Sequence, residues 1–118
     1  MTDNEILTIA VKAIDSKRGE NIRIIKIDEL TVIADYFIIA NGSSTTQVKA
    51  LADEVEFKLS EAGLEPKRTE GYQGANWIVL DYIDVVIHIF HKETRDFYDL
   101  ERLWQDGVEI SPQTYLDS

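Results

Sequence analysis

The residues best suited to chemistry lie in one short stretch, in which carboxylates and imidazoles alternate with apolar side chains. Asp81, Asp84, His88 and His91 are all metal-ligand types, and the two histidines are three positions apart. The strand-forming residues around them, from Trp77 to Phe90, predict β-structure, in which side chains three positions apart point to opposite faces. One metal ion would contact both histidines only where the strand ended between them. We therefore expect no metal site, no resident cofactor and no catalytic residue in this stretch.

The segment Asn-Gly-Ser-Ser at residues 41–44 is a second candidate, because it directly precedes a helical pattern. A helix N-terminus offers free backbone N–H groups to an anion. The segment lacks the lysine of a P-loop and the later glycines of a dinucleotide-binding loop, and the chain has no Gly-x-Ser-x-Gly nucleophile motif. The sequence therefore favours an ordinary N-capped helix start over an anion site.

These candidates depend on the strands that position them, and the residue pattern predicts a hairpin. Asp81–Asp84 has the composition of a turn between strands at Trp77–Leu80 and Val85–Phe90. Since strand side chains alternate between faces, a turn of two or four residues separates an aliphatic face from an aromatic face. The aliphatic face contains Ile78, Leu80, Val85, Ile87 and Ile89, and the aromatic face contains Trp77, Val79, Val86, His88 and Phe90. We expect the aromatic face to lie open and partly wet as a protein interface, the alternative being that another helix covers it.

Patterns in the rest of the chain predict a sheet with helices packed on it. Thr2 and Glu5 have the spacing of a capping box at the start of a first helix. Strands are predicted at residues 22–28 and 35–40, and a second helix ends at Gly63. A third helix is predicted at residues 94–104, with an apolar stripe formed by Phe97, Leu100, Leu103 and Trp104. The fold class is therefore α/β (α+β), with a mixed, about five-stranded sheet and flanking helices.

Length and charge restrict the class of protein. The 118 residues suit a single domain, expected at residues 1–107, with residues 108–118 as a flexible C-terminal tail. There is no cysteine, no secretory signal and no apolar run long enough to span a membrane, so we expect a cytoplasmic protein. The 12 basic and 22 acidic residues give a net charge of −10, which disfavours direct nucleic-acid contact and favours a basic protein partner.

Three segments carry a resemblance to a known family. They are VIADYFIIANGSS at residues 32–44, EGYQGANWIVLDYIDVVIHIF at residues 70–90 and RDFYDLERLW at residues 95–104. Together they resemble the Iojap family of ribosomal silencing factors, also called RsfS, and the likeness extends from Asp3 to Asp106. The resemblance implies a nucleotidyltransferase-like fold without known catalysis, self-association as a homodimer, and binding to the large ribosomal subunit through its basic protein number fourteen at the intersubunit face. It also implies that joining of the small subunit is blocked, which lowers translation when nutrients are scarce.

The fold relationship makes a nucleotidyltransferase-like enzyme the alternative function. Such an enzyme needs paired acidic metal ligands on a strand after its glycine-serine turn. Here a long helix without an Asp-x-Asp pair follows the turn, and Asp81 and Asp84 are predicted in another turn, which holds Ile83 where the family usually has glycine. We therefore expect a binding protein and not an enzyme. The expected partner-binding residues are Trp77, Val79, Tyr82, His88 and Phe90, with Arg95 and Tyr98 in support.

Overall fold

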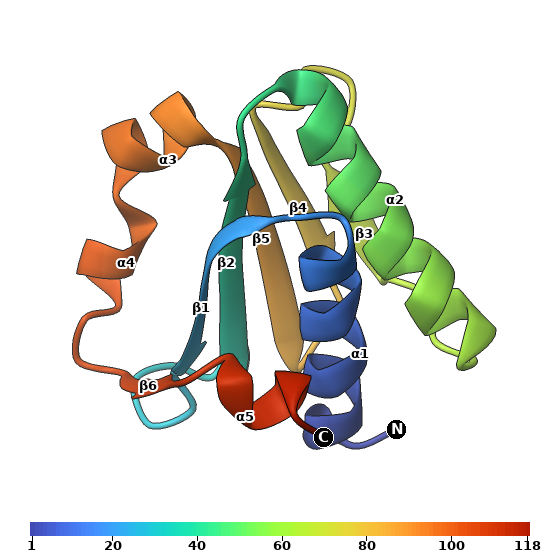
Figure 1. The fold of residues 1–118 in the computed structure, drawn as a ribbon. Coiled ribbons are helices and arrows are strands. Elements are labelled where there is room, and N and C mark those ends of the chain that lie inside the picture. The colour runs from blue at the N-terminus through green and yellow to red at the C-terminus, as the bar shows by residue number, and fades with distance from the viewer.

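The computed structural model describes all of residues 1–118 as one mixed sheet with helices on both faces (Figure 1). The strands are β1 (Glu20–Lys26), β2 (Tyr36–Gly42), β3 (Arg68–Glu70), β4 (Trp77–Asp81), β5 (Val85–His91) and β6 (Val108–Ile110). The helices are α1 (Asp3–Ser16), α2 (Thr45–Glu61), α3 (Lys92–Tyr98), α4 (Leu100–Leu103) and α5 (Gln113–Leu116). None of these helices combines the length and the apolar character that crossing a membrane demands.

The strand order in the sheet is β3-β4-β5-β2-β1-β6. β2 and β5 run parallel at the centre, and all other neighbouring strands are antiparallel. The predicted α+β class with a mixed sheet is confirmed, although the sheet has six strands instead of about five. The edge strands β3 and β6 have three residues each, which is too short for an alternating pattern to identify them in the sequence.

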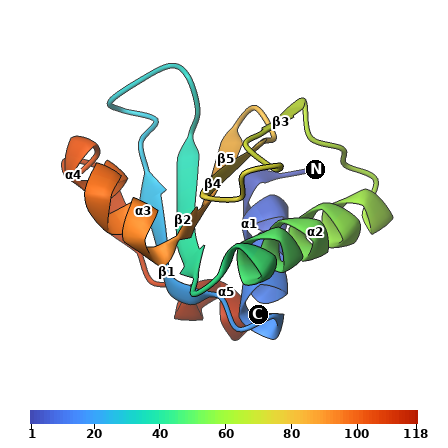
Figure 2. The same cartoon turned by 90° about the horizontal axis from the view of Figure 1, so that it is seen from above.

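Helices α1 and α2 cover one face of the sheet and build the larger of two cores with it (Figure 2). α1 begins with the predicted capping box, in which Thr2 Oγ1 accepts the backbone N–H of Glu5 and the Glu5 carboxylate accepts the backbone N–H of Thr2. α2 has Ser44 as its N-cap and ends before Gly63, whose φ of +96° suits glycine. This core holds 22 buried residues, so it supplies most of the apolar burial that stabilises the fold.

The opposite face carries a smaller core of seven buried residues, next to α3 and α4. The prediction of one continuous helix over residues 94–104 is wrong, because Asp99 has a left-handed backbone with φ of +48° that separates α3 from α4. Aspartate enters this region more readily than most residues do. The break leaves Phe97 and Leu103 exposed, while Leu100 remains buried in the smaller core.

β4 and β5 form the predicted hairpin, and their register confirms the even-length turn. Trp77 pairs with Phe90 and Asp81 pairs with Val86, so the two predicted faces are the observed ones. The aliphatic residues of the hairpin all lie in the larger core. The aromatic face is open only in part, because the smaller core forms over it and buries Phe90 fully and His88 almost fully, while Trp77, Val79 and Val86 remain partly exposed.

Residues 108–118 belong to the folded domain, which corrects the prediction of a flexible tail after residue 107. β6 pairs antiparallel with β1, and α5 packs against α1. Tyr115 is buried in the larger core, and its hydroxyl donates to Asn4 Oδ1 at 3.3 Å. A three-residue strand followed by a four-residue helix carries too little periodicity to be recognised from the sequence.

The substitution Tyr115→Ala tests whether these last residues stabilise the domain. We expect the free energy of unfolding to fall by about 3 kcal/mol, because the change leaves a cavity against α1 and removes a hydroxyl donor. Urea denaturation followed by circular dichroism measures the loss. Thr114→Ala is the control, since Thr114 is exposed, and should change stability by less than about 0.5 kcal/mol. Equal stability of the two variants would contradict the inclusion of residues 108–118 in the domain.

Candidate partner-binding site

Trp77, at the start of β4, joins the smaller core to the protein surface. Its ring stacks on Phe90 of β5, with a centroid distance of 4.8 Å and an interplanar angle of 26°. Its indole N–H donates to Nδ1 of His88 at 3.1 Å. The ring of Tyr98 in α3 lies 5.1 Å from it between centroids. Three neighbours from two elements therefore fix the orientation of this partly exposed tryptophan.

His88 lies behind Trp77 and is only 6% exposed. Its Nδ1 accepts a hydrogen bond from the indole N–H of Trp77. The neutral imidazole therefore carries its own proton on Nε2, which has no hydrogen-bond partner. Burial lowers the pKa of His88 to about 4, against the opposing effect of the Asp81 charge. His91 has a different role, because its Nδ1 accepts the backbone N–H of Glu93 at 3.3 Å and caps α3. At neutral pH His88 is therefore an uncharged acceptor that positions Trp77.

Exposed apolar side chains lie beside Trp77. We define the Trp77 surface as Trp77, Phe97, Tyr98 and Leu103. Phe97 is 80% exposed and Leu103 is 75% exposed. The rings of Phe97 and Tyr98 meet edge to face with centroids 5.1 Å apart. Neighbouring exposed aromatic side chains are typical of protein interfaces, where they provide large contact areas at a small cost in conformational entropy.

Two hollows flank the Trp77 surface. The first has a volume of about 540 Å³ and is lined by Gly71, Gly74, Asn76, Trp77, Glu93, Thr94, Phe97 and Tyr98. The second has a volume of about 650 Å³ and is lined by Asp96, Phe97, Tyr98, Asp99, Arg102, Leu103 and Gln105. The carboxylates of Glu93, Asp96 and Asp99 are part of these walls. The surface therefore has an apolar centre with a predominantly acidic rim, the arrangement found in protein interfaces.

Gly71 shapes the loop wall of the first hollow. Its φ is +80°, and a Cβ atom there would lie 2.0 Å from the carbonyl oxygen of Trp77. Both the left-handed backbone and this close approach require glycine. The loop between β3 and β4 is therefore packed directly against the backbone of the tryptophan.

The structure divides the seven expected partner-binding residues into three groups. The residues with exposed surface are Trp77, Val79 and Tyr98. The buried residues behind this surface are His88, Phe90 and Arg95. Tyr82 lies in the larger core, where burial raises the pKa of its hydroxyl. Direct contact with a partner requires an exposed side chain, which His88, Phe90, Arg95 and Tyr82 lack.

Arg95 is a buried bracing residue. Its Nη1 donates to the carbonyl oxygen of Asn21 at 2.7 Å and to Oδ1 of Asn41 at 2.9 Å. Its Nε forms an ion pair with Oε1 of Glu101 at 3.4 Å. These contacts tie α3 to β1, β2 and α4, so Arg95 holds in place the helix that presents Phe97 and Tyr98.

Phe97 and Leu103 are the surface residues that the sequence pattern missed. Their spacing with Leu100 and Trp104 fits one helix with a buried stripe, and that spacing alone predicts burial. The signal against one helix is Asp99, which is a poor helix former and tolerates a left-handed backbone. A single aspartate is too common within helical patterns to have predicted the break.

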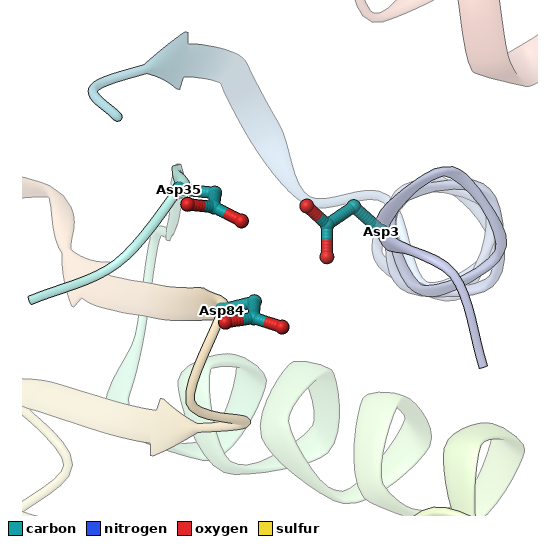
Figure 3. Close-up of side chains that lie close together, drawn as sticks. All are labelled: Asp3, Asp35 and Asp84. Atoms are coloured by element: carbon teal, nitrogen blue, oxygen red, sulfur yellow. The ribbon is translucent and has the colours of Figure 1, made fainter. Parts of the chain in front are cut away.

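Three carboxylates lie together at the other end of the sheet (Figure 3). Asp3 at the start of α1, Asp35 just before β2 and Asp84 just before β5 place carboxylate oxygens within 4.8 Å of one another. Burial raises the pKa of Asp3 to about 6, and Asp35 adds to this shift through a hydrogen bond and through its charge. Carboxylate oxygens are ligands for Mg²⁺ and Ca²⁺, although exposed acidic groups are also common without an ion. Sequence reasoning missed this group because its members come from three distant segments.

These carboxylates are far from the glycine-serine turn. β2 pairs in parallel with β5 from Tyr36 with Val85 to Gly42 with His91, so Asp84 precedes one end of the pair and the turn follows the other. A seven-residue strand spans about 20 Å. At the turn, Ser44 Oγ accepts the backbone N–H of Gln47 at 3.1 Å and caps α2. The arrangement therefore does not favour a nucleotidyltransferase-like enzyme, whose turn and paired acids must meet.

Comparisons of sequence and structure with known proteins agree with one another. A family model described as "Ribosomal silencing factor during starvation" matches residues 1–118. The ribosomal silencing factor RsfS of Halalkalibacterium halodurans is 43% identical over 110 residues, which cover 93% of this chain and 94% of that protein. A crystal structure of a Chromobacterium violaceum protein has 38% sequence identity and a TM-score of 0.87, and the match covers 94% of this chain and 92% of that one. A mouse protein named "Mitochondrial assembly of ribosomal large subunit protein 1" is 28% identical, over 83% of this chain and 44% of its own length.

Titration of His88 should be visible as a pH dependence of stability. Because the pKa of His88 falls from 6.5 to about 4 on folding, the unfolded chain binds more protons between these values, and stability falls as pH falls through this window. We expect a loss of about 3 kcal/mol from this group between pH 7 and pH 4. Chemical denaturation as a function of pH measures it. His88→Gln keeps a hydrogen-bond acceptor but cannot titrate, so its free energy of unfolding should depend less on pH between 4 and 7. His91→Asn should keep the pH dependence of the unmodified protein. Equal pH dependence in the two variants would refute the assignment to His88.

Titration of Asp3 should change stability with pH in the direction opposite to that of His88. Because its pKa is raised from 3.8 to about 6 in the folded protein, its contribution to stability falls as pH rises through this window. The change in the free energy of unfolding caused by Asp3→Asn should therefore be more favourable at pH 7 than at pH 4. The expected difference is about 1 kcal/mol after allowance for solvent screening. Carbon-13 NMR titration of the carboxyl groups measures the pKa of Asp3 directly, and Asp35→Asn should lower it. A carboxyl pKa near 4 for Asp3 in the unmodified protein would disprove the interaction.

Proposed function

Because this chain belongs to the RsfS family of ribosomal silencing factors, we propose that it binds the large ribosomal subunit at the intersubunit face and prevents the small subunit from joining. Translation is thereby lowered when nutrients are scarce. The name of the mouse relative, which refers to assembly of the ribosomal large subunit, supports this choice of subunit. A protein with this function works in the cytoplasm, where ribosomal subunits join.

The observation that carries this proposal is the Trp77 surface. Stacking on Phe90 and the hydrogen bond to His88 hold the indole in place before any partner arrives. A side chain that is already ordered loses little conformational entropy on binding, so more of its contact energy appears as affinity. Phe97 and Leu103 add exposed apolar area next to it. Aromatic anchors of this kind provide most of the binding energy in protein interfaces.

Charge favours a ribosomal protein over ribosomal RNA as the direct partner. The chain has a net charge of −10, which is repelled by a phosphate backbone. Carboxylates line both hollows beside the Trp77 surface, so a basic protein surface is the complementary one. We identify this partner as the basic protein number fourteen of the large subunit, which the family resemblance implies.

The mechanism we propose is steric exclusion, which requires binding but no chemical step. The domain measures 33 × 33 × 27 Å. A rigid body of this size on the intersubunit face occupies space that the small subunit needs. Affinity and position are therefore the properties that determine silencing, and catalytic residues are not required.

The proposed contact set is narrower than the sequence expectation. Trp77, Val79 and Tyr98 are retained as contacts, and Phe97 and Leu103 are added. The buried residues act behind this surface: His88 and Phe90 orient Trp77, and Arg95 holds α3. A homodimer is compatible with this proposal when it forms through another face, because the Trp77 surface then remains free for the ribosome. Light scattering of the purified protein measures its mass in solution.

Co-sedimentation with separated ribosomal subunits tests the proposal. We expect the unmodified protein to sediment with the large subunit, and Trp77→Ala to weaken this binding about 30-fold, the effect of losing an interface anchor worth about 2 kcal/mol. Phe97→Ser removes an exposed ring, so it should weaken binding without a large cost in stability. The fraction of protein in the pellet, measured over a range of subunit concentrations, gives each affinity.

Phe57→Ser is the matched control, because Phe57 is an exposed aromatic residue on α2, away from the Trp77 surface. It should bind the large subunit as the unmodified protein does. Unchanged binding by both Trp77→Ala and Phe97→Ser, in folded protein, would show that the contact surface is elsewhere. Binding to the small subunit alone would reject the proposed function itself.

A further inference from the structure

A second group of exposed apolar side chains lies at the end of the sheet opposite the Trp77 surface. It is formed by the loop between β1 and β2, the turn between β4 and β5, and the start of β6 (Figures 1 and 2). We call it the loop-end surface, and its members are Leu30, Val32, Ile33, Ile83 and Val108. Val32 is completely exposed, and Ile33 and Ile83 are each more than half exposed. Single exposed aliphatic residues are ordinary, but five at one end of a small domain are not.

Backbone contacts hold these segments together. The N–H of Asp35 donates to the carbonyl oxygen of Asp84 at 2.8 Å, and the N–H of Tyr36 donates to the same oxygen at 3.0 Å. The loop that carries Ile33 is therefore joined to the turn that carries Ile83. Leu30 and Val108 line a common hollow of about 100 Å³. The loop-end surface is thus a connected feature of the fold.

Ile83 is the most unusual member, because its backbone has φ of +73°. This left-handed region is a genuine outlier for a β-branched residue and strains the backbone. The N–H of Ile83 donates to Oδ1 of Asp81 at 2.8 Å, which fixes the turn. The side chain is 57% exposed, so burial within this molecule does not offset the cost. Packing inside the domain therefore gives no reason for an isoleucine at this position.

The charge around the loop-end surface is negative. Asp35 follows Ile33 by two residues and Asp84 directly follows Ile83. With Asp3 they place carboxylate oxygens within 4.8 Å of one another (Figure 3). Burial raises the pKa of Asp3, and a hydrogen bond with Asp35 and the charges of Asp35 and Asp84 add to the shift. Carboxylates this close together attract a cation. Asp28 and Glu29 line the hollow beside Leu30, where Lys26 pairs with Asp28 at 3.9 Å.

We infer that the loop-end surface is a second docking site, which binds a basic protein segment carrying lysine or arginine beside apolar side chains. The apolar residues of the partner cover Ile33 and Ile83, and its cations lie against the three carboxylates. Nucleic acid and anionic membrane surfaces are repelled by this charge, and a free cation makes no use of the aliphatic residues. The site is separated from the Trp77 surface by the length of β5, about 20 Å. One molecule is therefore able to hold two basic partners at once, whether or not the Trp77 surface binds the ribosome.

A synthetic peptide of alternating lysine and leucine residues is a suitable probe, with peptides of alternating lysine and serine or glutamate and leucine as controls. We expect the lysine-leucine peptide to bind the full chain, and each control peptide to bind at least about tenfold more weakly. Fluorescence anisotropy of labelled peptide measures the affinities. Proton–nitrogen NMR spectra of the labelled protein locate the site, with shifts expected at residues 30–35 and 82–84.

Ile83→Gly is the decisive variant, because it removes the side chain and also relieves the strained backbone. It should be folded and more stable than the unmodified protein, yet bind the lysine-leucine peptide about tenfold more weakly. Asp84→Asn should also weaken binding, and Phe57→Ser should not. Equal binding by Ile83→Gly, shifts centred on the Trp77 surface, or the same shifts produced by Mg²⁺ alone would each overturn the proposal. Loss of ribosome binding by Trp77→Ala has no bearing on this result, so the two proposals fail separately.

Discussion

The parallel pairing of β2 with β5 determines how the layers of this domain are arranged. The pairing is continuous from Tyr36 with Val85 to Gly42 with His91, and it lies at the centre of the sheet. A parallel pair is stable in water only when both of its faces are covered, because both faces are apolar. The chain therefore needs helices on both sides, and the two cores follow from this need. The same register fixes which functional groups lie at each end of the sheet.

The two faces are covered unequally, and the surface assigned to partner binding results from this difference. α1 and α2, with 14 and 17 residues, cover one face with long amphipathic helices. α3 and α4, with seven and four residues, are too short to cover the other face completely. They bury Phe90 and His88 but leave Trp77 partly exposed and present Phe97 to solvent. A rigid apolar surface is thus produced at the margin of a core, where the ordered interior extends to the protein surface.

The two ends of the sheet use different chemistry. One end has an aromatic surface supported by a buried histidine and arginine, and the other has aliphatic loops beside three carboxylates. Both are acidic at their edges, in agreement with a chain whose net charge is −10. The surface of a basic ribosomal protein, as proposed for the partner, is complementary to either end. The overall charge therefore agrees with the proposed basic partner, while the positions of Trp77 and Ile83 follow from this fold.

Elements with strong local signals could be predicted from the amino-acid sequence alone. The capping box at Thr2, the glycine that ends α2 and the two faces of the β4–β5 hairpin were predicted correctly, because each depends on residues near one another in the chain. The family motifs also determined the functional class. Long-range contacts alone show that the aromatic face is also partly covered, that Phe97 is exposed, that residues 108–110 add a strand to the sheet, and that Asp3, Asp35 and Asp84 meet. Each of these features depends on contacts between segments distant in sequence, which residue periodicity does not encode.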